Sequence, residues 1–242
     1  MRTSFLFIAF FFLSVQLCEA QQDAQKSSTI TWGYAPPFTA ASTTGTINFP
    51  ADYYGQWKIL FSHPADFTPV CTSEIIALAA MQDEFKKLNT AIIVLSTDGL
   101  NSHIEWVKSI ESVSIKGASS VKIGFPLVTD ANLDISKKYG ILQQDSSKSR
   151  DIRSVYIIDP ENEIQAMFYY PRTVGRNIEE IRRTLIALQT HEKYRVLTPA
   201  NWKLGDDVLI PSPLTIQEAE KLREKRNPDL YEVAWYMWYK KL

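Results

Sequence analysis

Residues 57–88 read WKILFSHPADFTPVCTSEIIALAAMQDEFKKL, the most informative stretch for the fold because it joins a strand pattern to a helix pattern. The apolar run at 57–62 predicts a buried strand, and the apolar residues after Cys71 recur at roughly helical spacing. Cys71 therefore stands where a strand turns into the first turn of a helix. Unpaired backbone N–H groups and the helix dipole favour an anion there. A cysteine at such a place is biased toward the thiolate, which is the nucleophilic form.

Strand and helix patterns alternate through residues 46–194, which we interpret as one domain. Strands are predicted at 58–62, 91–97, 126–129, 154–158 and 163–169, and helices at 72–88, 102–109, 133–139 and 177–191. Residues 159–162 predict a hairpin turn, and Asn177 followed by two glutamates predicts a helix start. The order indicates an α/β fold with a central mixed sheet flanked by helices.

The segments on either side of this domain have a different character. Residues 21–45 are rich in Gln, Ser, Thr and Ala and are expected to form an irregular lead-in. Residues 195–242 form an arm broken by prolines, with one short charged helix expected at about 215–225 and an aromatic cluster from Leu230 onward. Because exposed aromatic clusters are costly, the cluster packs either on its own domain or, as we favour, on a partner subunit in a homodimer. Membrane anchoring by its Trp and Tyr side chains is the least favoured alternative.

The first 20 residues predict a secretion signal. Arg2 gives a thin basic start, residues 5–17 are mainly apolar, and Ala20 offers a small residue before a cleavage point. The apolar run is shorter than the roughly 20 residues that a spanning helix needs. We therefore expect a secreted protein, or one in the lumen of the secretory pathway. An uncleaved signal anchor is the alternative.

Composition narrows the function further. The formal net charge of −1 gives no support for nucleic acid or an anionic membrane as the main partner. The three histidines show no metal-ligand spacing, so neither a metal nor another cofactor is expected. Of the two cysteines, Cys18 would leave with the signal. The odd cysteine that remains indicates a reactive thiol or an intermolecular disulfide.

The run before Cys71 supplies groups suited to one kind of electrophile. Thr68 offers a hydroxyl that can donate and accept, and the ring of Pro64 can shield a pocket from water. A thiolate among hydroxyl and N–H donors suits attack on two adjacent oxygen atoms, because the donors stabilise charge on the departing oxygen. The run lacks a fixed cation, for which Arg153 and Arg176 are the distant candidates.

Residues 62–74, SHPADFTPVCTSE, resemble the peroxidatic-cysteine motif of the peroxiredoxins. Residues 153–160 and 170–177 match companion stretches of that family, and residues 198–206 resemble the C-terminal region of its one-cysteine group. The resemblance runs from about residue 45 to about residue 225. It implies a thioredoxin-like fold with a C-terminal extension arm.

The resemblance also implies roles for the residues of the motif. Cys71 becomes the peroxidatic nucleophile, Thr68 the hydroxyl that hydrogen-bonds the peroxide, and Pro64 the shield. Arg153 becomes the guanidinium that holds both the thiolate and the peroxide.

Supporting roles follow from the same resemblance. Glu74 and Arg176 match positions that orient the active-site network. His63 matches a histidine near the sulfur in the one-cysteine group, and both a structural hydrogen bond and a catalytic role stay open for it. For His103 and Trp106, one turn apart on a helix, we expect ordinary packing.

The implied reaction is the reduction of hydrogen peroxide and organic hydroperoxides, in which Cys71 becomes a sulfenic acid that another thiol must reduce. No cysteine follows Cys71, so the reductant must be external, such as glutathione or a thioredoxin-like protein. A disulfide between two copies of Cys71 is an alternative product, although not a route to turnover.

Two further functions are weighed against the peroxidase. The alternative from another class is a non-enzymatic secreted module that binds partners or acts like a chaperone through its aromatic tail. Some one-cysteine relatives also carry a phospholipase A2 site, which we do not expect here. Gln56, Pro50 and Glu161 stand where those relatives have a serine, a histidine and an aspartate.

Overall fold

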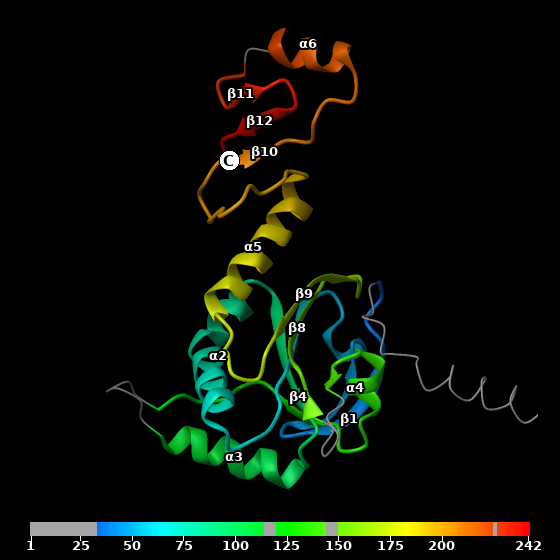
Figure 1. Cartoon of the computed structure of the whole chain (residues 1–242), viewed down its shortest axis with the longest axis vertical. Coiled ribbons are helices and arrows are strands. Elements are labelled where there is room, and N and C mark those ends of the chain that lie inside the picture. The colour runs from blue at the N-terminus through cyan, green and yellow to red at the C-terminus, as the bar shows by residue number, and fades with distance from the viewer. Residues whose placement is uncertain (1–32, 114–119, 144–149, 225–226) are drawn as a thin grey trace, which may run out of the picture.

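The computed structural model describes residues 33–113, 120–143, 150–224 and 227–242. A seven-stranded mixed sheet, in the order β2-β1-β5-β4-β3-β8-β9, forms its main body (Figure 1). The strands are β1 (Phe38–Ser42), β2 (Gly45–Phe49), β3 (Trp57–Ser62), β4 (Thr90–Ser96), β5 (Leu127–Thr129), β8 (Arg153–Ile158) and β9 (Ile164–Tyr170). Strands β3, β4 and β5 are parallel, whereas β8 and β9 are antiparallel to their neighbours.

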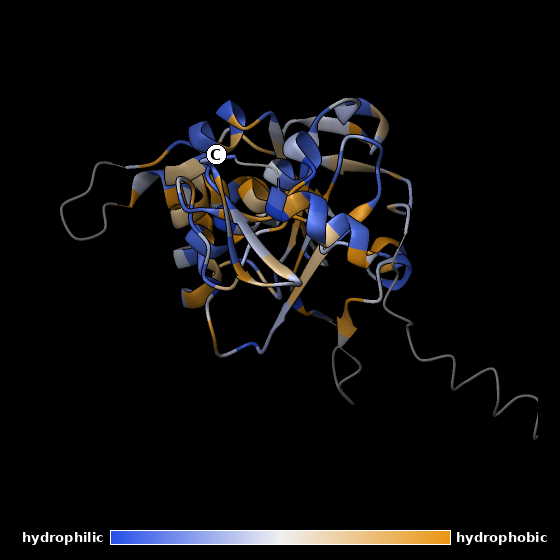
Figure 2. Ribbon diagram, turned by 90° about the horizontal axis from the view of Figure 1, so that it is seen from above, coloured by the Kyte–Doolittle hydropathy of each residue, from blue (hydrophilic) through white to orange (hydrophobic). Residues whose placement is uncertain are grey.

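Helices cover both faces of this sheet. One face packs against α2 (Pro69–Lys87), α3 (Leu100–Ser112) and α5 (Ile178–Tyr194), and the other against α4 (Asp134–Lys138). Every residue of β3 and β8 is buried, as expected of strands covered on both sides. Figure 2 shows helices that carry both hydrophilic and hydrophobic residues, the pattern of a helix with one face on a core.

Two smaller features complete the main body. A 3-10 helix, η1 (Ala51–Tyr53), precedes β3, and β6 (Leu142–Gln143) pairs with β7 (Arg150–Asp151) just before β8. Among the described residues, none of the helices is both long enough and apolar enough to span a membrane.

Helix α5 leads away from the main body to a C-terminal module, the described residues of 195–242 (Figure 1). There β10 (Val208–Leu209), β12 (Met237–Lys240) and β11 (Leu230–Ala234) form an antiparallel sheet beside α6 (Ile216–Glu224). A small apolar cluster joins the module to α5; its buried members are Ile186, Val196, Trp202 and Val208.

Most of the elements predicted from sequence are confirmed, with bounds that differ by a few residues. The mixed sheet flanked by helices is present, and the turn at 159–162 joins β8 to β9. The Asn177 side chain accepts a hydrogen bond from the Glu180 backbone N–H at 3.2 Å, so it caps α5 as predicted.

Two predictions need correction. The lead-in is not irregular at its end, because Phe38–Ser42 forms β1 and pairs with β2. This stretch of small and hydroxyl residues has a weak strand pattern, and its place is fixed by Phe38, which stacks on Phe49 at 5.0 Å between ring centroids. The C-terminal arm also contains three strands where only a helix was predicted. The predicted signal and the lead-in up to residue 32 lie outside the described residues.

Candidate active site

Cys71 is fully buried in the first turn of α2, directly after β3, where the sequence placed it. Thr68 is the N-cap of this helix, and its hydroxyl makes no capping bond. That hydroxyl donates instead to the Ala65 carbonyl at 2.9 Å. A hydroxyl has a single proton, so the lone pairs of Thr68 stay free to accept from a substrate.

Arg153 supplies the fixed cation that the local sequence lacks. Its Nη1 lies 3.2 Å from the Cys71 sulfur and donates to Glu74 Oε2 at 2.6 Å, while its Nε donates to the Arg172 carbonyl at 3.1 Å. The side chain is only 4% exposed, and a guanidinium is not deprotonated in proteins. A permanent positive charge against the sulfur favours the thiolate.

Glu74, one turn further along α2, binds a second guanidinium. Arg176 donates to the two Glu74 oxygens from Nε at 3.0 Å and from Nη2 at 2.8 Å. Its Nη1 donates to the carbonyls of Ser62 at 2.7 Å and Ser154 at 2.8 Å, and its Cζ lies 3.3 Å from the centroid of the Phe61 ring. Burial lowers the pKa of Arg176, and the hydrogen bonds to Glu74 oppose that shift. Arg176 thus links Glu74 to the end of β3 and to the start of β8.

His63 follows β3 directly and is fully buried, as is its neighbour Pro64. Among the described residues, neither ring nitrogen of His63 has a hydrogen-bond partner, so the structural hydrogen bond considered above is not present. Burial lowers the pKa of His63 to about 3, which keeps the ring neutral. The ring packs 5.0 Å from that of Trp106. A catalytic role for His63 stays a prediction.

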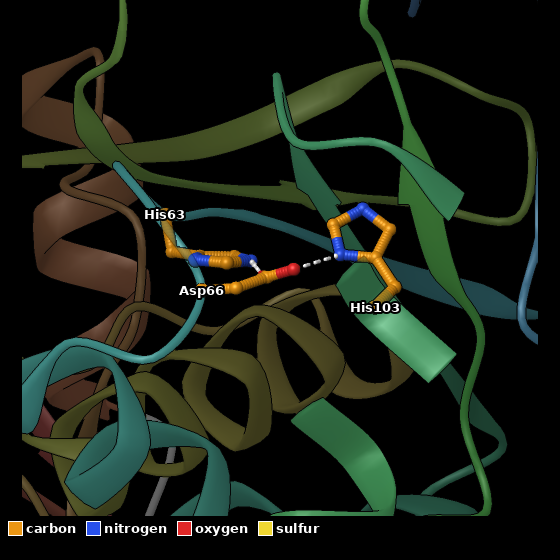
Figure 3. A group of neighbouring side chains, drawn as sticks. All are labelled: His63, Asp66 and His103. Atoms are coloured by element: carbon orange, nitrogen blue, oxygen red, sulfur yellow. Dashed lines mark hydrogen bonds and ion pairs between the residues drawn. The ribbon is translucent and has the colours of Figure 1, made fainter. Parts of the chain in front are cut away.

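Three further side chains lie near Cys71 and His63, and the sequence predicts ordinary packing for two of them. Trp106 Nε1 donates to Thr72 Oγ1 at 3.2 Å, beside Cys71. His103 Nδ1 lies 2.8 Å from Asp66 Oδ2 (Figure 3). The available signal was spacing, because His103 and Trp106 are one helical turn apart and Asp66 stands in the quoted motif itself.

The seven candidate residues therefore lie at or beside one site. Arg153 contacts Cys71 and Glu74, Arg176 binds Glu74, and Thr68 is the residue at which the helix that carries the sulfur begins. His63 and Pro64 lie in the turn that leads to this helix. The arrangement can hold an anionic sulfur away from water, with a cation on one side and a hydroxyl acceptor close by in the chain.

Comparisons with known proteins identify the family of the chain. Residues 33–167 match the model of the AhpC/TSA family, and residues 187–226 match the C-terminal domain of 1-Cys peroxiredoxin. A protein of Methanosarcina mazei named peroxiredoxin is 47% identical over 208 residues, which cover 86% of this chain and 95% of that protein. A peroxiredoxin of Aquifex aeolicus is 42% identical over 219 residues, with the same two coverages of 86% and 95%.

Two solved structures share the fold. A yeast mitochondrial 1-Cys peroxiredoxin superposes with a TM-score of 0.76 at 36% identity, covering 86% of this chain and 97% of the other. A cysteine-to-serine variant of peroxiredoxin 6 from Arenicola marina gives a TM-score of 0.77 at 30% identity, with 88% and 99% covered. These likenesses confirm the thioredoxin-like fold with a C-terminal extension that the sequence predicted.

Proposed function

This chain belongs to the AhpC/TSA family and is a peroxiredoxin, a thiol-dependent peroxidase, and from that premise we propose a one-cysteine cycle on hydrogen peroxide and organic hydroperoxides. The observation that carries the proposal is the contact of 3.2 Å between Arg153 Nη1 and the Cys71 sulfur. It pairs a single buried thiol with a fixed positive charge.

In the proposed reaction, a lone pair of the Cys71 thiolate attacks the terminal oxygen of ROOH. The S–O bond forms as the O–O bond breaks, and the electron pair of that bond leaves on RO⁻, which takes a proton from solvent. The balance is ROOH + Cys–S⁻ + H⁺ → ROH + Cys–SOH. Arg153 stabilises the negative charge as it moves from sulfur to oxygen. The free lone pairs of Thr68 accept the O–H of the peroxide and orient it.

The sulfenic acid is returned to the thiol by an external reductant. No cysteine follows Cys71, so the chain offers no resolving thiol after it. The matched yeast protein is described as resolved via glutathione and thioredoxin systems. For this chain we propose the same chemical class, glutathione or a thioredoxin-like protein.

The proposed setting is a secreted homodimer. The apolar run at residues 5–17 supports export, and Ala20 supports cleavage. The C-terminal module supports self-association, because Val233, Trp235 and Tyr236 are each more than half exposed. An exported enzyme that uses an external thiol needs that reductant in the compartment to which it is exported.

Peroxide consumption, with dithiothreitol as the reductant, tests the proposed roles. We expect Cys71→Ser to abolish turnover and Arg153→Met to lower kcat/KM by about 100-fold, the usual cost of removing a group that stabilises developing charge. Arg223→Met is the matched control, because that exposed arginine pairs with Glu232 in the C-terminal module. Wild-type kinetics in Arg153→Met would refute the role of Arg153. A non-enzymatic binding module would be indifferent to all three substitutions.

A further inference from the structure

Three side chains converge under the turn between β3 and α2 (Figure 3). His63 and Asp66 come from the turn, and His103 comes from the first turn of α3. Their side chains are 0%, 2% and 0% exposed, and one ligand atom from each, an imidazole nitrogen or a carboxylate oxygen, lies within 4.8 Å of the other two. The peroxidase reaction described above makes no use of Asp66 or His103.

Both ring nitrogens of His103 face acceptor oxygens. His103 places Nδ1 2.8 Å from Asp66 Oδ2 and Nε2 3.2 Å from the Val128 carbonyl, which are both acceptors. A neutral imidazole has one N–H, so it can satisfy only one of them. A proton or a metal ion on Nδ1 is therefore needed only when the N–H of His103 serves the Val128 carbonyl.

The other half of the cluster is also incomplete. Among the described residues, Asp66 Oδ1 and both ring nitrogens of His63 have no hydrogen-bond partner. His63 Nε2 is 3.6 Å from Asp66 Oδ1, beyond hydrogen-bond distance. Buried polar atoms are nearly always paired, and His63 Nε2 and Asp66 Oδ1 face each other without a partner, which indicates a ligand that completes them.

We propose that His63, Asp66 and His103 bind a divalent transition-metal ion, with Zn²⁺ as the best match. Two imidazoles and a carboxylate are a donor set that suits zinc. Ligand atoms of a tetrahedral zinc ion lie about 3.4 Å apart. Each histidine faces its own Asp66 oxygen, at 2.8 and 3.6 Å, and the three ligand atoms lie within 4.8 Å of one another. Binding would draw the two imidazoles closer together.

The surroundings of the cluster have the features of a metal site. With the proton on Nε2, His103 would donate to the Val128 carbonyl at 3.2 Å and leave Nδ1 as the ligand; metal-bound histidines are commonly oriented in this way. Asp98 accepts the Asp66 backbone N–H at 2.7 Å, so a second carboxylate fixes the turn and adds negative charge. The neighbouring Phe67 is 58% exposed with a φ of 54°, so the turn that carries Asp66 lies at the surface.

A bound ion would join the turn that carries Pro64 and Thr68 to helix α3. Metal binding would then stabilise the folded chain, because an ion that binds only the native state raises the unfolding temperature. The site is separate from the sulfur in its ligands, since it uses no thiolate.

The test measures zinc binding to the untagged full chain after chelator treatment. Calorimetry gives the affinity, and metal analysis after dialysis gives the zinc that is retained. We expect one retained zinc per chain and a higher unfolding temperature with zinc. His103→Gln and Asp66→Asn should weaken binding by at least about ten-fold and lose the temperature shift. His191→Gln, at an exposed histidine of α5, is the matched control and should bind as the wild type does. Cys71→Ser should also bind fully.

X-ray absorption at the zinc edge of the wild-type chain keeps the proposal testable if a variant fails to fold. We expect nitrogen and oxygen ligands with two imidazoles and no sulfur. Zinc lost on dialysis, unchanged binding in His103→Gln, binding lost in Cys71→Ser or His191→Gln, or a sulfur ligand would each overturn the proposal.

Discussion

The Cys71 sulfur shares a buried space with three charged side chains. Arg153 and Arg176 carry positive charges, and Glu74 carries a negative one. Unpaired buried charges are unstable, and the charge-assisted hydrogen bonds between Glu74 and the two guanidinium groups leave one positive charge in excess. The thiolate of the proposed cycle would balance that charge.

A further buried carboxyl group lies two residues before Arg153. Asp151 is 0% exposed, and neither of its oxygens has a hydrogen-bond partner among the described residues. The nearby Ser136 hydroxyl donates its proton to Asp130 Oδ2 at 2.5 Å instead. Burial, with repulsion from Asp130, raises the pKa of Asp151 well above its ordinary value.

This raised pKa predicts a specific dependence of stability on pH. The folded chain keeps the Asp151 proton at pH values where the unfolded chain has lost it, so stability falls as pH rises above the ordinary aspartate range. The expected slope is up to about 1.4 kcal/mol for each pH unit. Asp151→Asn cannot titrate, and its unfolding temperature should rise relative to wild type between acidic and neutral pH. A difference that does not vary with pH would contradict this assignment.

At the scale of secondary structure, strand pairing brings the site together. β8 runs antiparallel to β3, with Phe61 opposite Val155, so the start of β8 lies beside the end of β3. Arg153 at that start thus meets the helix that follows β3, 82 residues away in sequence from Cys71. Arg176 arrives just before the first residue of α5, so the start of that helix sets its position.

The cap of α5 is therefore expected to support both stability and the site. Asn177→Ala removes the side-chain acceptor of the Glu180 N–H and should lower the free energy of unfolding by about 1 kcal/mol. Asn177→Asp keeps an acceptor and should cost much less. Denaturant unfolding measures both variants, and equal losses in the two would show that the cap does not act through its hydrogen bond.

Some of these elements are predictable from local sequence, and others are not. β3 and α2 follow from local periodicity, and the companion stretches of the family resemblance supplied Arg153 and Arg176, which contact the sulfur and Glu74. The strands β1, β2, β6 and β7 and the three short strands of the arm did not follow, because tertiary packing decides them more than local pattern does. The cluster of Asp66 and His103 depends on the crossing of α3 beneath the turn, which spacing along the chain does not reveal.

At the scale of the whole molecule, the C-terminal module stands at the end of α5, away from the main body (Figure 1). The arm is attached through Trp202, which is 2% exposed, packs in the cluster with Ile186 of α5, and accepts from Arg183 Nη1 at its carbonyl at 3.2 Å. Within the aromatic tail, Trp238 is buried, whereas Trp235 is 60% exposed and Tyr236 is 55% exposed. The tail thus packs partly on its own module and still presents an apolar surface.

That surface predicts the effect of a single substitution on assembly. If it forms part of a homodimer interface, Trp235→Ser should shift the protein toward the monomer in light scattering coupled to gel filtration, because buried aromatic side chains dominate interface energies. Tyr54→Ser is the matched control, since Tyr54 is 85% exposed on the main body. A wild-type chain that is monomeric at every concentration, or equal effects of the two substitutions, would contradict the proposed dimer.

The most direct test of the central claim is mass spectrometry of the intact chain after one pulse of hydrogen peroxide without reductant. We predict the addition of one oxygen atom at Cys71, no addition in Cys71→Ser, and a much slower addition in Arg153→Met. The same spectrum of the exported protein reports whether its N-terminus begins after Ala20. Peroxide reduced with no oxygen on Cys71, or oxidation at the same rate without the Arg153 guanidinium, would contradict the mechanism.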